Sequence, residues 1–195
     1  DALIMVGGIE AAAQAYEAAL KLDPRHTVAK VRLAQCLHRS GQTALARQLL
    51  TALVAEDSSA PVEALALLAE FHIAAQEPAK AAPLLERLSQ LRPTDLALKL
   101  RLAYCYCEMA TSGDAGAKAK ALALYDELAR RADDLTLRRT AAESALTLRH
   151  GALGKDLAAA KEALAAGKEV ATLRQLDTLA KRHPGVAQIH YLRGI

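Results

Sequence analysis

The sequence contains neither asparagine nor tryptophan, and phenylalanine occurs once, at Phe71. Aromatic residues make up 3% of the 195 residues, so large rings cannot fill the core of this fold. Hydrophobic residues nevertheless reach 52%, and most of them are alanine and leucine, which both favour helices. The composition therefore predicts an all-helical chain in which small side chains let the helices approach one another closely.

Strong charge and long apolar runs are absent as well. The net charge of +3 is too small to require a nucleic acid or a membrane surface as partner. No apolar run approaches the roughly 18 residues that a membrane-spanning helix needs. The residues from Asp1 to Val6 lack the basic start of a signal peptide. Because the chain begins with aspartate in the middle of a repeating pattern, we expect it to be a piece of a longer protein.

Cysteine is scarce, and its number is odd: Cys36, Cys105 and Cys107. An odd number argues against a disulfide framework. Cys105 and Cys107 lie two residues apart in an apolar segment, and residues two apart on a helix point to different faces. We therefore expect buried structural thiols rather than a shared metal site. Unpaired cysteines favour a cytoplasmic location, while the missing native N-terminus leaves a periplasmic one open.

What the sequence does contain is one pattern that recurs about every 34 residues. In its clearest copy, residues 7–24, a turn glycine precedes a helix with alanines and Tyr16 on one face, and an Asp-Pro pair ends it. The pattern restarts at Gly41, Gln76 and Gly167. A fixed period of this length predicts stacked helical hairpins, a fold whose usual function is to hold other proteins.

Proline and glycine mark the joints between the expected helices. The helices are expected at residues 9–22, 27–40, 43–56, 61–76, 78–91, 95–110, 117–131, 135–149, 153–166, 169–182 and 186–195. Asp95 and Asp134 stand where N-caps belong. Lys181, Arg182 and His183 fall in a last turn, where positive charge suits the helix dipole.

Two segments interrupt the pattern. Residues 111–116 form a small polar insertion, which is either a plain flexible loop or a binding edge. Helix 135–149 has no obvious partner, because 153–166 and 169–182 pair well across Gly167. It is an unpaired helix, an irregular repeat or the remnant of a missing segment.

The spacing of large and small residues resembles the tetratricopeptide repeat. The first-helix positions are Lys30, Leu33, Ala34 and Leu37, then Leu65, Leu68, Ala69 and His72, then Lys99, Leu102, Ala103 and Tyr106. The second-helix positions are Ala12, Tyr16, Ala19 and Pro24, then Ala46, Leu50 and Leu53, then Ala81, Leu85, Leu88 and Pro93, then Ala121, Tyr125 and Leu128. The absent tryptophan and the leucines in aromatic positions depart from the family pattern.

The resemblance implies an all-α fold, a right-handed superhelix of stacked antiparallel helix hairpins (a tetratricopeptide-like α-solenoid). It covers nearly the whole chain as one domain, residues 1–195. The expected repeats are 1–26, 27–60, 61–95, 96–134 and 153–186, with an irregular helix at 135–152 and the start of another repeat at 187–195.

In this family the first helices line a concave groove that holds an extended peptide or a partner helix. Carried over by position, the groove residues here are Val31, Gln35, His38, Arg39, Ala66, Glu70, Ile73, Leu100, Arg101, Tyr104 and Glu108. One subgroup grips the C-terminal carboxylate of chaperones with a lysine and an asparagine. The matching positions here hold Val31 and Gln35, so the resemblance disfavours that partner.

No set of residues forms a recognisable catalytic, cofactor or metal site. Gly113 and Gly116 lack the strand and the Lys-Ser/Thr pair of a phosphate loop. His38 and His72 lie in nearly equivalent positions of adjacent repeats, where they would be neighbours in the groove, but a metal site needs three or four ligands. Paired arginines at 130–131 and 138–139 are either a basic patch for an acidic partner or, for the first pair, compensation of a helix dipole.

These observations predict a non-catalytic interaction module that captures a protein or peptide segment in a preformed groove. The alanine-rich, asparagine-free composition suggests a bacterial source and, by analogy of fold, a role in assembly, secretion or exopolysaccharide export. The alternative is a regulatory or substrate-recruiting arm of an enzyme whose catalytic domain lies elsewhere. RNA binding is a weaker alternative, because the predicted groove is mostly aliphatic.

Overall fold

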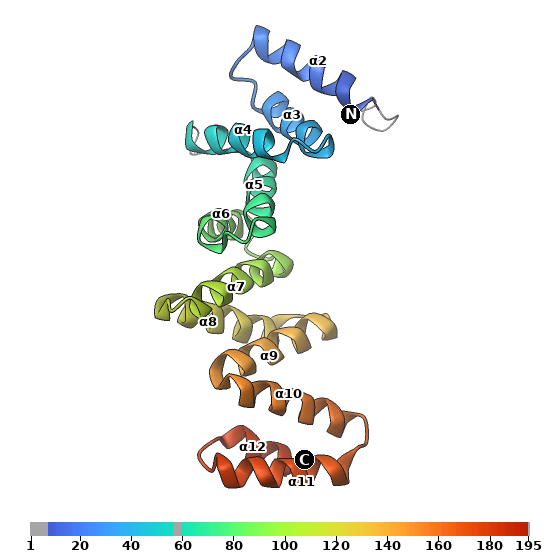
Figure 1. Ribbon diagram of the computed structural model, residues 1–195, viewed down its shortest axis with the longest axis vertical. Helices are drawn as coiled ribbons and strands as arrows, with labels where there is room; N and C mark the ends of the chain where they lie inside the picture. Colours follow the sequence, from blue (N-terminus) through green and yellow to red (C-terminus); the bar gives the residue numbers. More distant parts are fainter. Residues whose placement is uncertain (1–7, 57–59, 195) are drawn as a thin grey trace. The chain divides into compact units, whose positions relative to one another are not determined.

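The computed structural model describes residues 8–56 and 60–194 of the chain. Across these residues it consists of eleven α-helices and contains no strand. The helices belong to two compact units, Asp1–Met109 and Ala110–Ile195 (Figure 1). The turn glycine predicted at Gly7, the link from Asp57 to Ser59, and Ile195 lie outside the described residues.

The first unit contains helices in the order that the sequence predicts. They are α2 (Ile9–Leu22), α3 (Thr27–Arg39), α4 (Thr43–Glu56), α5 (Val62–Ala74), α6 (Pro78–Leu91) and α7 (Leu96–Thr111), whose last two residues belong to the second unit. Each helix packs against the next from α2 through α6. In α7, the hydroxyl of Tyr106 donates a hydrogen bond to the carboxylate of Glu86 in α6.

Small residues stand at the closest helix contacts of the first unit. Ala34, Ala69 and Ala103, the expected small positions of three successive hairpins, are all 0–1% exposed. Leu50 and Leu85 are buried to the same extent in the facing second helices. Small and large side chains together fill this core, to which Phe71 and Tyr106, each 5% exposed, add two aromatic rings.

The hairpin turns share one hydrogen-bond pattern. After α3, the N–H of Gly41 donates to the carbonyl of His38 and the N–H of Gln42 to that of Leu37. After α5, Gln76 and Glu77 repeat these bonds to Ile73 and His72. Such a turn needs a residue with positive φ, which is 83° at Gly41 and 57° at Gln76. Gln76 therefore occupies a glycine position.

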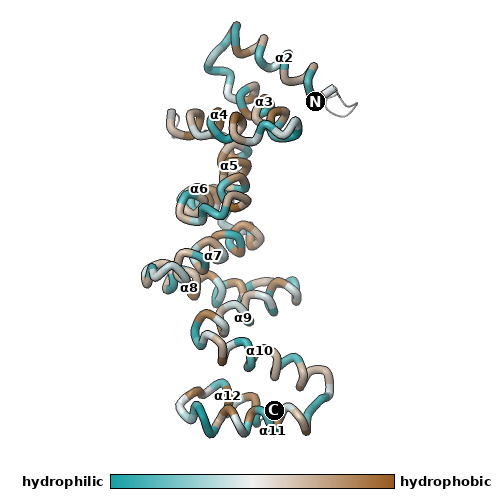
Figure 2. The backbone as a smooth tube through the Cα atoms, in the orientation of Figure 1, coloured by the Kyte–Doolittle hydropathy of each residue, from teal (hydrophilic) through white to brown (hydrophobic). Residues whose placement is uncertain are grey.

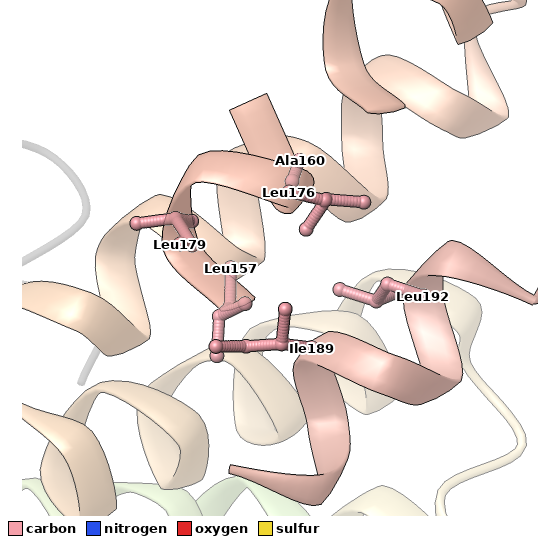
Figure 3. Close-up of a cluster of buried hydrophobic side chains, with 6 residues drawn as sticks. All are labelled: Leu157, Ala160, Leu176, Leu179, Ile189 and Leu192. Carbon is pink, nitrogen blue, oxygen red and sulfur yellow. The ribbon is translucent and has the colours of Figure 1, made fainter. Parts of the chain in front are cut away.

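The second unit contains the remaining helices. They are α8 (Ala115–Arg131), α9 (Leu135–His150), α10 (Ala152–Ala165), α11 (Glu169–Arg182) and α12 (Ala187–Arg193). One part of its buried core is a cluster of six apolar residues from α10, α11 and α12: Leu157, Ala160, Leu176, Leu179, Ile189 and Leu192 (Figure 3). Lys181 and Arg182 lie in the last turn of α11, as expected from the helix dipole.

Helix α9 is not unpaired, which excludes one of the three alternatives that the sequence left open. It packs against both α8 and α10. Arg149 forms an ion pair with Asp126 of α8, and Arg139 lies 3.0 Å from the carboxylate of Glu162 in α10. A Cβ at Gly154 of α10 would lie 2.3 Å from the carbonyl oxygen of Leu146, so only glycine permits this approach.

The polar insertion predicted at residues 111–116 is shorter than expected, a turn at residues 112–114 between two helices. α7 continues to Thr111 and α8 begins at Ala115. The carboxylate of Asp114 caps α8 by accepting a hydrogen bond of 2.9 Å from the N–H of Ala117. The predicted caps Asp95 and Asp134 accept equivalent bonds from Leu98 and Leu137.

Hydrophilic residues occur on every helix of both units (Figure 2). Within the described ranges, none of the helices combines the length and the apolar character that crossing a bilayer requires.

Candidate functional site

The predicted groove residues all lie in the first unit, on α3, α5 and α7, which we call the first helices. His38, Arg39, Glu70, Arg101 and Tyr104 are exposed. The half-buried ones are Gln35, Ala66, Ile73, Leu100 and Glu108. Val31 is only 5% exposed, so it contributes to the core more than to a surface.

Two contacts connect the first helices. The rings of His38 in α3 and Phe71 in α5 lie 4.8 Å apart between centroids. Nη1 of Arg101 in α7 donates a hydrogen bond of 2.8 Å to Oε1 of Glu70 in α5. The two contacts thus link α3, α5 and α7, and the exposed His38, Glu70 and Arg101 lie on what we call the first-helix face.

An exposed tyrosine and an aliphatic side chain lie near the ion pair of Glu70 and Arg101 on this face. Tyr104 follows Arg101 by three residues and is 51% exposed. Ile73 follows Glu70 by three residues and is half-buried. Because residues three apart lie on one side of a helix, an aromatic ring and an aliphatic side chain accompany the two charges.

One polar residue of the first-helix face, Arg32, was not predicted from the sequence. Nη1 of Arg32 donates a hydrogen bond of 3.0 Å to Oε1 of Gln35, one of the predicted groove residues. Arg32 follows Val31 just as Arg101 follows Leu100, so the repeat register contained the signal for it. The side-chain carbonyl of Gln35 is therefore already engaged in the free protein.

His38 and His72 take part in different contacts, although the sequence suggested that they would be neighbours. Nδ1 of His38 lies 3.0 Å from Oγ1 of Thr43. His72 is 8% exposed, and its Nδ1 lies 2.8 Å from Oε2 of Glu77. In the part of the chain that the structure describes, no three His, Cys, Asp or Glu side chains are placed to hold a metal ion.

Glu77 is the centre of a polar cluster at the start of α6. Besides His72, its carboxylate contacts Nζ of Lys80 at 2.8 Å and Nη1 of Arg47 at 3.3 Å. The hydrogen bonds from Lys80 and His72 lower the pKa of Glu77 to about 2. The carboxylate is therefore charged throughout the neutral range and holds two cations from α4 and α6 in place.

Two of the three thiols are buried as expected. Cys36 is 0% and Cys105 is 1% exposed, and burial raises the pKa of both, that of Cys105 to about 11. Both are therefore thiols rather than reactive thiolates at neutral pH. Cys107 is half-buried, so it does not share the full burial predicted for the pair.

Three of the four arginines near the turn between α8 and α9, Arg131, Arg138 and Arg139, are engaged within the second unit. Arg131 lies 2.9 Å from Glu127 and ends α8, where its charge suits the helix dipole. Nε and Nη2 of Arg138 both donate to the carbonyl of Ala132, at 3.0 and 2.7 Å. Arg139 contacts Glu143 and Glu162. These contacts favour a structural role over a basic docking patch.

Comparison with known proteins identifies a repeat family in the first part of the chain. Residues 3–71 match the family model described as "Tetratricopeptide repeat". No curated protein matches the chain at a significant level. The match begins before α2 and ends within α5, and the helices in that range form the hairpins that the resemblance implies. This segment of the chain is therefore composed of tetratricopeptide repeats, a family of repeats that mediates protein–protein interaction.

Proposed function

We propose that the first unit is a non-catalytic binding module that captures an extended peptide or a helix of a partner protein on its first-helix face. The repeat family supplies the general function, protein–protein interaction. The location of the binding surface is the part that we propose.

The observation that carries the proposal is the exposure of Tyr104 beside the ion pair of Glu70 and Arg101. Tyrosine and arginine dominate the energetically important positions of protein interfaces. An exposed ring offers a large contact area that loses little conformational entropy on binding. Tyr104 is 51% exposed, and the charges next to it are already held at 2.8 Å from one another. A partner therefore meets a largely preformed surface.

The surface favours a partner segment with apolar anchors and at least one acidic residue. Ile73 and Leu100 are half-buried and offer aliphatic contact area. The guanidinium of Arg101 carries five N–H donors, of which Nη1 contacts Glu70. A partner carboxylate can bind the remaining donors, which would set orientation and association rate more than affinity.

Site-specific photocrosslinking tests this proposal. A photoreactive phenylalanine analogue would replace Tyr104 in one variant and Leu91, at the end of α6, in a control. The two positions are comparably exposed, at 51% and 58%. We expect a discrete adduct in host extract from position 104 and none from position 91.

The captured protein would then be titrated against the wild type and against Arg101→Ala/Tyr104→Ala. Since both side chains are exposed, the double variant is expected to fold normally and to bind at least about tenfold more weakly. Equal affinity in a folded double variant would place the binding surface elsewhere. The larger assembly that such a module would serve stays a prediction from composition and analogy.

A further inference from the structure

The second inference concerns a different surface of the first unit, between the second helices α4 and α6. We propose that this surface, the α4/α6 trough, binds an acidic amphipathic helix of a partner protein. The trough has a volume of about 950 Å³ and is defined here by Ala52 and Ala55 of α4, Ala79 and Pro83 of α6, and Leu68 and His72 of α5. It uses none of the predicted groove residues on the first-helix face.

Three alanines form part of the walls of the trough. Ala52, Ala55 and Ala79 are exposed, whereas Leu68 and His72 are buried. Alanines along two neighbouring helices let a third backbone approach closely, and its apolar side chains can then fill the space between them. A volume of about 950 Å³ is far larger than one side chain requires, and it suits the apolar face of a helix.

Pro83 adds an unusual feature, because it lies inside α6 and is exposed. Proline has no N–H, so the carbonyl of Ala79, four residues earlier, lacks its regular helical donor. Both residues line the trough. The exposed ring of Pro83 therefore adds apolar surface to the trough.

The charge of the trough determines the kind of partner. Arg47 and Lys80 both line it, and their side chains are 39% and 62% exposed. They share a single carboxylate, that of Glu77, which also bonds to His72. Two cations around one anion leave a net positive charge at the trough. Carboxylates beside the apolar stripe of a partner helix complement it, and lysines there would be repelled.

Two synthetic amphipathic peptides test the proposal. Both carry leucines at the same positions, and the flanking positions hold glutamate in one peptide and lysine in the other. Each is titrated into isotope-labelled protein while amide resonances are followed. We expect the acidic peptide to shift resonances of α4 and α6 around Ala52 and Ala79, and to bind at least about tenfold more tightly than the basic peptide.

A matched pair of variants identifies the surface. Ala52→Trp places a large ring in the trough, whereas Ala44→Trp places the same ring on α4 at an exposed position that does not line it. We expect at least about tenfold weaker binding of the acidic peptide to the first variant and unchanged binding to the second. Lys80→Gln is expected to weaken binding of the acidic peptide severalfold and to strengthen binding of the basic peptide, because one source of repulsion is removed.

Several results would overturn the inference. They are no binding of the acidic peptide at millimolar concentration, shifts confined to α3, α5 and α7, equal binding of the two peptides, or equal binding by Ala52→Trp and the wild type. Because every variant lies outside the first-helix face, none of these results bears on the crosslinking test at Tyr104.

Discussion

Oε1 of Glu70 accepts a hydrogen bond from Nη1 of Arg101 across 31 positions of sequence, which links α5 to α7 on the first-helix face. The two side chains are 52% and 54% exposed. An exposed pair of this kind contributes at most about 1 kcal/mol to stability. The ion pair therefore matters more for partner binding at this surface than for the free energy of unfolding of the first unit.

The first prediction separates these two roles. Glu70→Gln and Arg101→Gln should each change the free energy of unfolding by less than about 1 kcal/mol in denaturant titrations. Their effects on partner binding should be opposite. Loss of Glu70 frees the guanidinium for an acidic partner and strengthens binding, whereas loss of Arg101 weakens it. Unchanged or tighter binding by Arg101→Gln would show that the partner does not use Arg101.

The second prediction concerns the turn after α5. Gln76 has a φ of 57°, a conformation that disfavours a side chain, and it is exposed. Gln76→Gly should therefore raise the free energy of unfolding by about 1 kcal/mol. Gly41→Gln is the reciprocal control, because Gly41 occupies the equivalent turn with a φ of 83° and a Cβ there would meet no atom within 4 Å. It should lower stability by a similar amount, and a gain would contradict the assignment.

The third prediction concerns the helix contacts. Ala69 is 1% exposed where α5 meets its neighbours, so Ala69→Leu should overpack the interface and cost about 1–3 kcal/mol. Ala74→Leu adds the same group at an exposed position of the same helix and should change stability by less than about 0.5 kcal/mol. Thermal or chemical unfolding of the two variants compares them directly. Similar values would place Ala69 outside the tight contact.

Much of this fold was predictable because its determinants are local. Glycine, proline and capping aspartates end and begin the helices, and every predicted helix lies within two residues of an observed one. The interruption predicted at 111–116 is present, but as a turn of residues 112–114 only. Asp114 acts as a cap, after which α8 begins at Ala115, earlier than the glycine at 116 suggested. The partners of α9 depend on tertiary contacts such as Arg139 with Glu162, which no local pattern reveals.

The candidate site was predictable in part for the same reason. The repeat register predicted which positions face outward on α5 and α7, and Glu70, Arg101 and Tyr104 are indeed exposed. It could not predict that Glu70 and Arg101 bind each other, since their contact depends on how successive hairpins stack. Whether a partner uses this face stays a prediction. The prediction that His72 neighbours His38 in the groove was wrong because the two positions differ by one residue within the repeat. On a helix, a shift of one residue turns a side chain toward another face.

The last prediction concerns acid stability and the cluster around Glu77. The pKa of this carboxyl is lowered in the folded protein to about 2 by hydrogen bonds from Lys80 and His72, whereas an unfolded glutamate titrates at about 4.3. A lowered pKa contributes stability above the unfolded value, and this contribution is lost as the pH falls from about 4.3 toward about 2. Unfolding by denaturant should therefore become easier across this interval.

Glu77→Gln removes the titrating group and should therefore flatten the pH dependence of the free energy of unfolding over that interval. The variant should also be less stable at neutral pH, because His72, Lys80 and Arg47 lose the carboxylate that they share. Glu63→Gln, at an exposed position in the first turn of α5, serves as the control and should leave the pH dependence close to that of the wild type. An unchanged slope for Glu77→Gln below pH about 4.3 would mean that the three contacts do not lower the pKa of Glu77 in solution. The contacts would then be too mobile to fix Arg47 and Lys80 around the carboxylate, although both positive charges would still line the α4/α6 trough.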